Sequence, residues 1–363
     1  MLSCHSWLKK KILIIGPYPP PIGGLSIHIK RFCEFLFSIG ETDFALVDDS
    51  KNNSIKDINN MDIIIGKRKL LILLQLLFMS RNRVIHYHSH SWIMRYILVK
   101  ICKLRKIKIC FTFHSFRDEI DRFNYFKKKI VKCVLEKGDH FIAVNLLIKE
   151  KLIKYGCSRE KVSVIPAFIK PINNEKFKIK KEIMDFINSK DKILTANASG
   201  MRFYEGEDLY GIDMCIELLG RLKVKRREKI GFIFLLPQVE DSDYFIKLKK
   251  RIEELKIKKD FLFITDKVEM YPILKQSSIF LRPTNSDGDA ISVREAISLE
   301  ITCIASDVAV RPEGVINFKT RDLDDLEKIT NKILNNYDYY KEKAKNNECP
   351  NYAEEGYKVY SKL

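Results

Sequence analysis

The sequence of 363 residues has nine cysteines but no Cys-x-x-Cys pair. The cysteines are scattered along the chain, and most of them have apolar neighbours. An odd, unpaired set argues against a disulfide framework and against a zinc site built from cysteine. It favours free thiols, which persist in a reducing compartment. We therefore expect a cytoplasmic protein.

The chain also lacks an apolar run long enough to cross a membrane. Its longest run, Leu70–Met79, is interrupted only by Gln75. As a helix this run would span roughly 15 Å, about half of the hydrocarbon core of a bilayer. We interpret it first as a buried helix and second as a contact with one membrane leaflet. The segment Met1–Lys11 has no apolar core, so we expect no signal peptide.

Acidic residues are scarce in the first half of the chain. Residues 1–170 hold 31 Lys and Arg against 14 Asp and Glu, whereas the rest of the chain is nearly neutral. Such asymmetry favours an anionic partner, either a membrane surface, an anionic lipid or nucleic acid. Because no interleaved aromatic and basic RNA-binding motif is present, we expect no nucleic acid. The basic clusters are Lys67–Lys69, Lys100–Lys108 and Lys127–Lys132.

Short apolar runs alternate with segments of helical periodicity. The run Lys11–Gly16 predicts a strand, Pro17–Gly24 a loop and Leu25–Ser38 a helix. The alternation continues to Pro166, is interrupted by the lysine-rich segment Lys170–Ser189, and restarts at Ile193. The pattern predicts an α/β fold with two doubly wound parallel sheets. We expect domains at residues 1–170 and 171–345, followed by a C-terminal helix within 346–363 that packs back on the first domain.

A pair of acidic residues, Asp287 and Glu295, lies eight positions apart near the end of the second half. A turn of small residues separates them, and a helix is predicted to follow. The N-terminus of a helix suits a phosphate, while carboxylates suit hydroxyl groups, so the pair indicates a ligand such as a nucleotide sugar. A structural alternative stays open, because Ser292 to Glu295 also fits a capping box and Asp287-Gly288 an ordinary turn.

With these motifs in view, the chain resembles glycosyltransferase family 4, whose members have the GT-B fold. The resemblance covers essentially the whole chain. Its strongest element is Asp287–Glu295 with the following residues up to Val308, which matches the Glu-x7-Glu region of the family with Asp287 in place of the first glutamate. The other matching segments are Lys11–Ile29, Val84–His90, Ile109–Ser115, Phe141–Pro166 and the remainder of Ile279–Gly314. The implied fold is two Rossmann-like domains facing a central cleft.

The resemblance also implies roles for individual residues. Gly23 and Gly24 correspond to the loop that approaches the donor diphosphate. His114 corresponds to the family histidine near the donor sugar and the reacting centre. Arg202 corresponds to the arginine that holds the diphosphate. The donor site is further implied to include Arg282, Asp287, Gly288, Asp289 and Glu295, with Asp287 at the donor sugar or its phosphates and Glu295 at the ribose hydroxyls.

Two departures from the family pattern affect this site. The family usually has a lysine before the glycine that follows its arginine, whereas here Tyr210 precedes Gly211. The missing charge then needs another source, for which Arg282 and Arg311 are the candidates. Glu300 also stands where the family usually has a helix-ending glycine.

The histidines at 86, 88 and 90 alternate, which places them on one face of a predicted strand. Metal ligation there is possible, but the family does not require it. We expect no metal and no cofactor.

The function implied is retaining transfer of a sugar from a UDP- or GDP-sugar to an acceptor hydroxyl, with a glycan or lipid-linked acceptor at the anionic inner face of the cell membrane. Three alternatives stay open. Asp287-Gly288-Asp289 fits a metal-binding D-x-D motif of the other glycosyltransferase fold. The same two-domain fold also serves sugar-nucleotide epimerases. The basic half would also suit a nucleic-acid binder or a non-catalytic partner in an assembly complex.

Overall fold

The computed structural model describes residues 6–20, 22–50, 63–65, 69–116, 118–172, 179–266 and 268–363. The chain divides into two compact units, which we call unit 1 (Met1–Ile172 with Asn351–Leu363) and unit 2 (Asn173–Pro350). The last segment of the chain therefore belongs to unit 1, and the second boundary lies five residues beyond the expected position. The expected basic cluster Lys67–Lys69 lies outside the described side chains.

Unit 1 contains a parallel sheet of seven strands in its described part, in the order β3-β2-β1-β4-β5-β6-β7. The strands follow short buried apolar runs, as is typical of a sheet covered on both faces. They are β1 (Ile12–Gly16), β2 (Phe44–Asp48), β3 (Ile63–Ile65), β4 (Val84–Tyr87), β5 (Lys108–Phe113), β6 (His140–Ala143) and β7 (Val162–Val164). The strand order reverses between β1 and β4, which pair directly.

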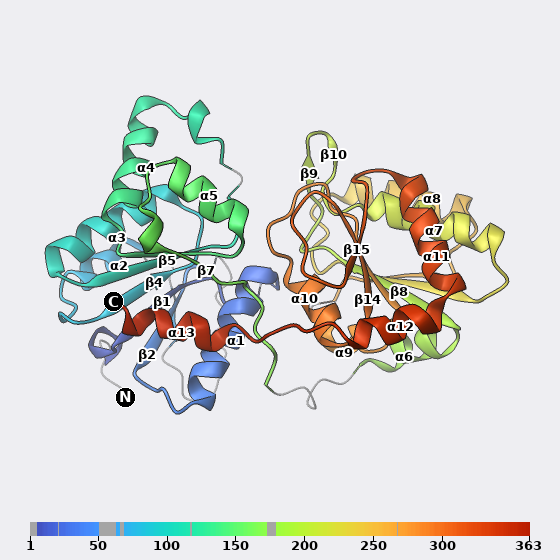
Figure 1. Cartoon of the computed structure of the whole chain (residues 1–363), viewed down its shortest axis with the longest axis horizontal. Coiled ribbons are helices and arrows are strands. Elements are labelled where there is room, and N and C mark those ends of the chain that lie inside the picture. The colour runs from blue at the N-terminus through green and yellow to red at the C-terminus, as the bar shows by residue number, and fades with distance from the viewer. Residues whose placement is uncertain are drawn as a thin grey trace. The chain divides into compact units, whose positions relative to one another are not determined.

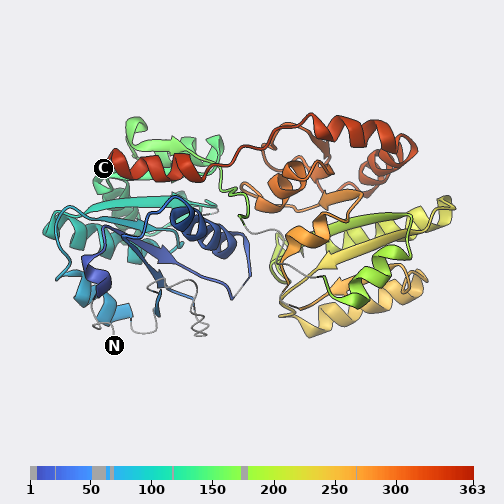
Figure 2. The ribbon, with the colours of Figure 1, turned by 90° about the horizontal axis from the view of Figure 1, so that it is seen from below.

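Helices cover both faces of this sheet (Figure 1). They are α1 (Gly24–Ser38), α2 (Lys69–Leu76), α3 (Trp92–Arg105), α4 (Tyr125–Lys137), α5 (Leu146–Lys154) and α13 (Ala353–Ser361). Figure 2 shows α1 and α13 on the same face of the sheet. There Phe32 of α1 and Tyr360 of α13 pack in one apolar cluster with Ile12 and Ile14 of β1. Short 3-10 turns occur at Ser6–Lys9, Ile120–Arg122 and Arg159–Lys161.

In its described residues unit 2 repeats the arrangement, with a parallel sheet of six strands in the order β12-β11-β8-β13-β14-β15. These are β8 (Lys192–Asn197), β11 (Ile230–Leu235), β12 (Phe261–Ile264), β13 (Ile279–Arg282), β14 (Thr302–Ser306) and β15 (Val315–Phe318). A separate two-stranded hairpin joins β9 (Phe203–Tyr204) to β10 (Glu207–Asp208). The order of the large sheet reverses between β8 and β13.

The helices of unit 2 are α6 (Lys181–Asn188), α7 (Ile212–Lys225), α8 (Ser242–Glu254), α9 (Met270–Leu274), α10 (Ile291–Ser298), α11 (Leu323–Asn335) and α12 (Tyr337–Lys345). An apolar cluster joins α7, α8 and α11 to the sheet through Leu219, Leu248 and Leu326. Figure 1 shows α6, α9 and α10 on the opposite face. There Ile183 of α6 and Val293 of α10 belong to two further clusters.

The apolar run Leu70–Met79 forms α2 and the turn after it, and it is only half buried. Ile72, Leu76 and Met79 are buried, whereas Leu71 and Phe78 are exposed. The expectation of a buried helix is therefore correct for one face only. None of the helices in the described ranges has the length and apolar character needed to span a bilayer.

Candidate active site

A group of polar side chains lies where the strand order of the unit 2 sheet reverses. In open parallel sheets, ligands bind at such a reversal, beyond the carboxyl ends of the strands. Here β8 ends at Asn197 and β13 ends at Arg282. The Arg282 guanidinium joins the two strand ends, because its Nη1 donates to the Asn197 backbone oxygen at 3.1 Å.

Asp287 lies between two guanidinium groups. Arg282 donates to both of its carboxylate oxygens, at 3.1 and 3.3 Å, and Arg311 donates to one at 2.8 Å. All three side chains are at least 89% buried. Burial by itself raises the pKa of the Asp287 carboxyl, but Arg282 and Arg311 outweigh it and lower the pKa to about 2. The three groups carry one net positive charge at the reversal point.

The rest of the acidic motif leads into α10. Asp289 accepts from the Nε of Arg294 at 2.6 Å, and Gly288 donates its backbone N–H to Asp287 at 3.1 Å. Glu295 is buried in the second turn of the helix. The helix begins at Ile291 with Ala290 as N-cap, so Ser292 is not the N-cap of a capping box.

This arrangement bears on the alternative in which Asp287-Gly288-Asp289 binds a metal. Asp287 is neutralised by two arginines, and Asp289 is neutralised by Arg294. A D-x-D motif needs carboxylate oxygens that face an ion. Both aspartates instead act as acceptors for guanidinium groups of the same unit, which disfavours the metal-binding alternative.

Arg202 is exposed and immediately precedes the β9–β10 hairpin. The hairpin is attached to the loop after β13, because Asn285 donates its side-chain amide to the Tyr204 backbone oxygen at 3.2 Å. Arg202 and the Asp287 motif are therefore parts of one loop system. The hairpin was not expected from the sequence, since each of its strands has only two residues.

The position of the missing lysine is occupied by the aromatic ring of Tyr210. The Arg282 guanidinium carbon lies 5.3 Å from the centre of this ring, within reach of a cation–π contact. The Tyr210 hydroxyl lies 2.7 Å from the Ser199 hydroxyl. Gly211 adopts a left-handed backbone conformation with φ of 68°, and a Cβ there would lie 2.4 Å from the Pro283 carbonyl oxygen. Glycine is thus required at 211.

Asp208 is a buried residue that sequence reasoning missed. Its carboxylate accepts the backbone N–H groups of Tyr210, Gly211 and Ile212 at the start of α7, and also the Tyr244 hydroxyl at 2.8 Å. Burial raises the pKa of Asp208 in spite of these bonds. An internal carboxylate therefore holds the N-terminus of α7, where an anionic ligand would otherwise bind. The signal in the sequence is an aspartate a few residues before the start of a predicted helix.

In unit 1 the corresponding reversal point lies between β1 and β4. Gly23 and Gly24 are at the start of α1, where the Gly23 backbone N–H donates to the Ser26 hydroxyl at 3.0 Å. Gly23 has an extended backbone with φ of −167°, which any residue adopts. Its conformation alone therefore gives no reason for glycine. The predicted role, close approach to a diphosphate, stays a prediction.

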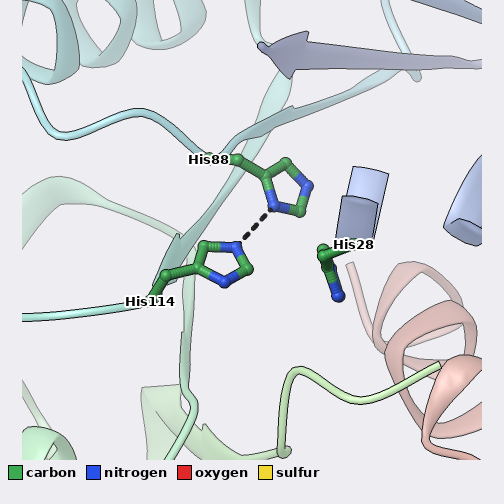
Figure 3. Close-up of side chains that lie close together, drawn as sticks. All are labelled: His28, His88 and His114. Carbon is green, nitrogen blue, oxygen red and sulfur yellow. Dashed lines mark hydrogen bonds between the residues drawn. The ribbon is translucent and has the colours of Figure 1, made fainter. Parts of the chain in front are cut away.

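His114 directly follows β5 and belongs to a cluster of three imidazoles (Figure 3). Its Nε2 lies 3.2 Å from Nδ1 of His88, which directly follows β4. His28 of α1 completes the cluster, with its ring centre 4.8 Å from that of His114. Burial is the main cause that lowers the pKa of all three imidazoles, to about 4 for His28 and well below the ordinary value for His88 and His114. The cluster is thus neutral at pH 7.

The expectation that residues 86, 88 and 90 share one strand face is only partly correct. The strand ends at Tyr87, so His88 and His90 lie beyond it. The rings of His86 and His88 are 4.0 Å apart, but His86 bonds elsewhere, to the Tyr360 hydroxyl and to Thr112. The histidine grouped with His88 and His114 is His28, which no motif of the sequence singles out.

The chain is similar to known proteins both in sequence and in fold. Residues 60–171 match the family model Glycosyltransferase Family 4, and residues 206–350 match the model Glycosyl transferases group 1. A search of curated proteins finds no match. Among solved structures, HepE of Anabaena in complex with UDP and glucose is similar, with a TM-score of 0.72 and 10% identity over 98% of this chain and 100% of that chain.

Two further structures show the same similarity of fold. Sucrose-phosphate synthase from Thermosynechococcus elongatus aligns with a TM-score of 0.70 and 14% identity, over 98% of this chain and 99% of that chain. A glycosyltransferase from Rickettsia africae aligns with a TM-score of 0.72 and 13% identity, over 97% and 98%. The two family models together span most of the chain and both of its units. The protein is therefore a glycosyltransferase of the GT-B fold, belonging to the group 1 and family 4 glycosyltransferases.

Proposed function

We propose that the protein is a retaining glycosyltransferase that moves a sugar from a nucleotide diphosphate sugar to a hydroxyl of a lipid-linked glycan. The observation that carries this proposal is that each sheet has a polar cluster at its reversal point. Unit 2 has the guanidinium–carboxylate network of Arg282, Asp287 and Arg311, and unit 1 has the imidazole cluster with His114. In unit 2, a net positive charge at such a point suits a diphosphate.

In this proposal unit 2 binds the donor. HepE has been solved with UDP and with UDP-glucose, which supports a uridine nucleotide as the first donor to test. Arg202 is exposed and is not one of the arginines that pair with Asp287. It is therefore the arginine best suited to bind the diphosphate through two parallel hydrogen bonds. Arg282 and Arg311 contribute the charge that the absent lysine would supply. Glu295 accepts hydrogen bonds from the ribose hydroxyls. Gly288 and Asp289 line the same site.

Asp287 then has a different task from the one implied by the family resemblance. Its two oxygens already accept from Arg282 and Arg311. We propose that it fixes the directions of both guanidiniums before the donor arrives. A diphosphate is a good leaving group, so pre-aligned positive charge is more useful to it than a strong general acid.

Unit 1 is proposed to bind the acceptor, with His114 at the reacting centre. A surface at the start of α4 supports an acceptor held at an anionic membrane, where the protein would associate peripherally on the cytoplasmic face. Tyr125 and Phe126 are 78% and 72% exposed there. They are followed directly by three exposed lysines, Lys127, Lys128 and Lys129. Exposed aromatics beside lysines are typical of segments that rest on an anionic bilayer.

The donor assignment is tested by steady-state kinetics after a panel of UDP- and GDP-sugars has been screened for hydrolysis without acceptor. We expect Glu295→Ala to raise the donor KM strongly, and His114→Ala to lower kcat more than donor affinity. The exposed loop residue Glu313 gives a matched control, since Glu313→Ala should leave both parameters unchanged. Unchanged donor KM in the Glu295 variant would remove that residue from the donor site. The anomeric configuration of the product, read by NMR, distinguishes retention from inversion.

A further inference from the structure

The cluster of His28, His88 and His114 offers three nitrogen ligands from three different elements. Their ligand atoms all lie within 4.8 Å of one another. Figure 3 shows the three rings around a common space, with His28 projecting from α1 toward the ends of β4 and β5. Three imidazoles with one position left open form a frequent zinc site. We propose that unit 1 binds a zinc ion through these three side chains, and that the bound ion inhibits sugar transfer.

Two of the nitrogens already have the spacing that zinc requires. Nδ1 of His88 and Nε2 of His114 are 3.2 Å apart. Two nitrogens that each lie about 2.0–2.1 Å from a tetrahedral zinc ion are separated by about 3.3 Å. Without an ion, one of these nitrogens donates a hydrogen bond to the other. With an ion, both nitrogens would direct a lone pair at the metal. The His28 ligand atom lies within 4.8 Å of the other two, and its ring would move closer to them to complete the set.

The third ligand is oriented by a backbone contact. Nδ1 of His28 lies 2.7 Å from the Ala167 carbonyl oxygen. A carbonyl oxygen only accepts, so the proton is on Nδ1 and the lone pair is on Nε2. A metal-bound histidine typically has its other ring nitrogen held by a carbonyl or carboxylate in this way. The contact with the Ala167 carbonyl oxygen, which orients the His28 ring, therefore exists before the ion binds.

A close approach of α1 to the sheet brings His28 to the cluster. A Cβ at Gly16, the last residue of β1, would lie 2.5 Å from Cδ1 of Ile29 and 3.1 Å from Cβ of His88. Glycine at 16 thus leaves room for both neighbours. Because Ile29 follows His28 directly, the same contact sets the distance between His28 and His88.

The three imidazole ligands favour zinc over Mg²⁺ and Ca²⁺. The cluster contains nitrogen ligands and no carboxylate. Mg²⁺ and Ca²⁺ prefer oxygen ligands, whereas zinc accepts neutral imidazoles. His88 is buried, but His28 and His114 are partly exposed, so an ion can enter from their side.

Inhibition follows from the place of His114, and this half of the inference rests on the proposed function. An imidazole bound to zinc cannot exchange a proton or donate a hydrogen bond through the ligating nitrogen. The family resemblance implies a reaction without a required metal. The ion would therefore be a reversible inhibitor that competes for a residue of the acceptor site.

Binding is tested on tag-free, chelator-treated full-length protein by titration with Co²⁺, a spectroscopic substitute for zinc. We expect one Co²⁺ per chain with the intense visible absorption of a tetrahedral site, displaced by Zn²⁺. His28→Ala and His88→Ala should weaken binding by more than about tenfold. His90→Ala removes a nearby exposed histidine outside the cluster and should leave binding unchanged. Circular dichroism verifies that each variant is folded.

Lack of a stoichiometric visible spectrum in the unaltered protein would overturn the site, whatever the variants do. So would a loss of binding in the His90 variant as large as that in the His28 variant. Inhibition is measured separately, as transfer rates with added Zn²⁺ and after EDTA. Cobalt binding with uninhibited transfer would overturn the inhibitory half. Cobalt binding in a protein that transfers no sugar would instead count against the proposed function.

Discussion

At the scale of single residues, the Asp287 carboxylate shows how one substitution changes the chemistry of a site. Two buried guanidiniums, those of Arg282 and Arg311, surround it. Aspartate is one methylene shorter than the glutamate usual in the family, so its oxygens stay close to the loop and within reach of both arginines. The positive charge at the reversal point of unit 2 is thereby held by contacts inside the protein.

We predict that Asp287→Asn lowers the free energy of unfolding of unit 2 by about 3–5 kcal/mol, because two buried guanidiniums lose the anion that they share. The control is Asp324→Asn, which removes an exposed partner of Arg221 and should cost less than about 1 kcal/mol. Urea denaturation followed by fluorescence measures both. Equal effects of the two substitutions would show that the Asp287 network contributes no more than a surface ion pair.

The same carboxylate makes stability depend on pH. Its pKa is about 2 in the folded protein and 3.8 ordinarily, so ionisation stabilises the fold. The contribution, about 2 kcal/mol, is complete above about pH 4 and is lost as the pH falls through 2. The Asp287→Asn variant should therefore show a flatter loss of stability in this acidic range than the unaltered protein.

Glu300 ends α10 in a left-handed conformation with φ of 61°. The turn that the family builds with glycine thus persists here with a residue that has a Cβ. We predict that Glu300→Gly stabilises unit 2 by about 1 kcal/mol, since glycine adopts this conformation without steric cost. Thermal unfolding of the two proteins measures the change. A lower melting temperature of the variant would mean that the Glu300 side chain stabilises the fold by more than its strain costs.

Residue identities alone could not have predicted the imidazole cluster. His88 and His114 each follow a strand, and the sequence places both strands in one sheet. His28 is 60 positions from His88, on a helix whose approach is decided by packing at Gly16. The pairing of Asp287 with Arg311 could likewise not be predicted from the sequence, because the two residues lie 24 positions apart. Only the folded chain brings these side chains together.

At the scale of elements, α4 combines two kinds of surface. Ile130, Val131 and Val134 pack into unit 1, whereas the first turns expose Tyr125 and Phe126 beside lysines. The Asn124 side chain caps the helix by accepting from the Lys127 backbone N–H at 2.9 Å. The cap fixes where the helix starts, and hence which residues of this turn face outward.

We predict that neutralising Lys127, Lys128 and Lys129 to glutamine weakens binding to anionic vesicles by about 3 kcal/mol, or about 1 kcal/mol per charge. Replacing Tyr125 and Phe126 by serine should weaken it further. Val224, an exposed apolar residue of unit 2, supplies the control substitution Val224→Ser. Co-sedimentation with vesicles of anionic and of zwitterionic lipid measures the difference. Full binding by the lysine variant would exclude α4 as the membrane contact.

The regular elements were largely predictable, because each core strand is a short apolar run followed by a turn. Ile12–Gly16 is an example, and it lies within Lys11–Gly16, where the sequence predicts a strand. The β9–β10 hairpin was not predictable, since two-residue strands have no periodicity. Its turn, Glu205-Gly206, adopts positive φ at both residues, as two-residue hairpin turns commonly do.

At the scale of the whole molecule, unit 1 is built from two distant parts of the chain. Ala353, Val359 and Tyr360 of α13 are buried in its core. The Tyr360 hydroxyl also lies 2.6 Å from Nδ1 of His86 on β4. The last segment is therefore a part of unit 1 and not an appendage to unit 2.

We predict that deleting residues 351–363 destabilises unit 1 by more than about 4 kcal/mol, because it exposes a core surface, and leaves unit 2 unchanged. Differential scanning calorimetry should resolve two transitions, of which only one is lost or shifted. The Glu300→Gly variant provides the converse control, since it should move only the other transition. If the deletion shifted both transitions equally, the two units would not unfold independently.

The place of α13 also sets an order of events on the ribosome. Domains usually fold from the N-terminus onward as they emerge. Here residues 1–172 lack their closing helix until Asn351–Leu363 has been synthesised, whereas unit 2 is complete at Pro350. During that interval the apolar face around Phe32 and Ile12 is uncovered. Of the two units, unit 1 thus begins first and is finished last, and in the cell it depends longer on protection from aggregation.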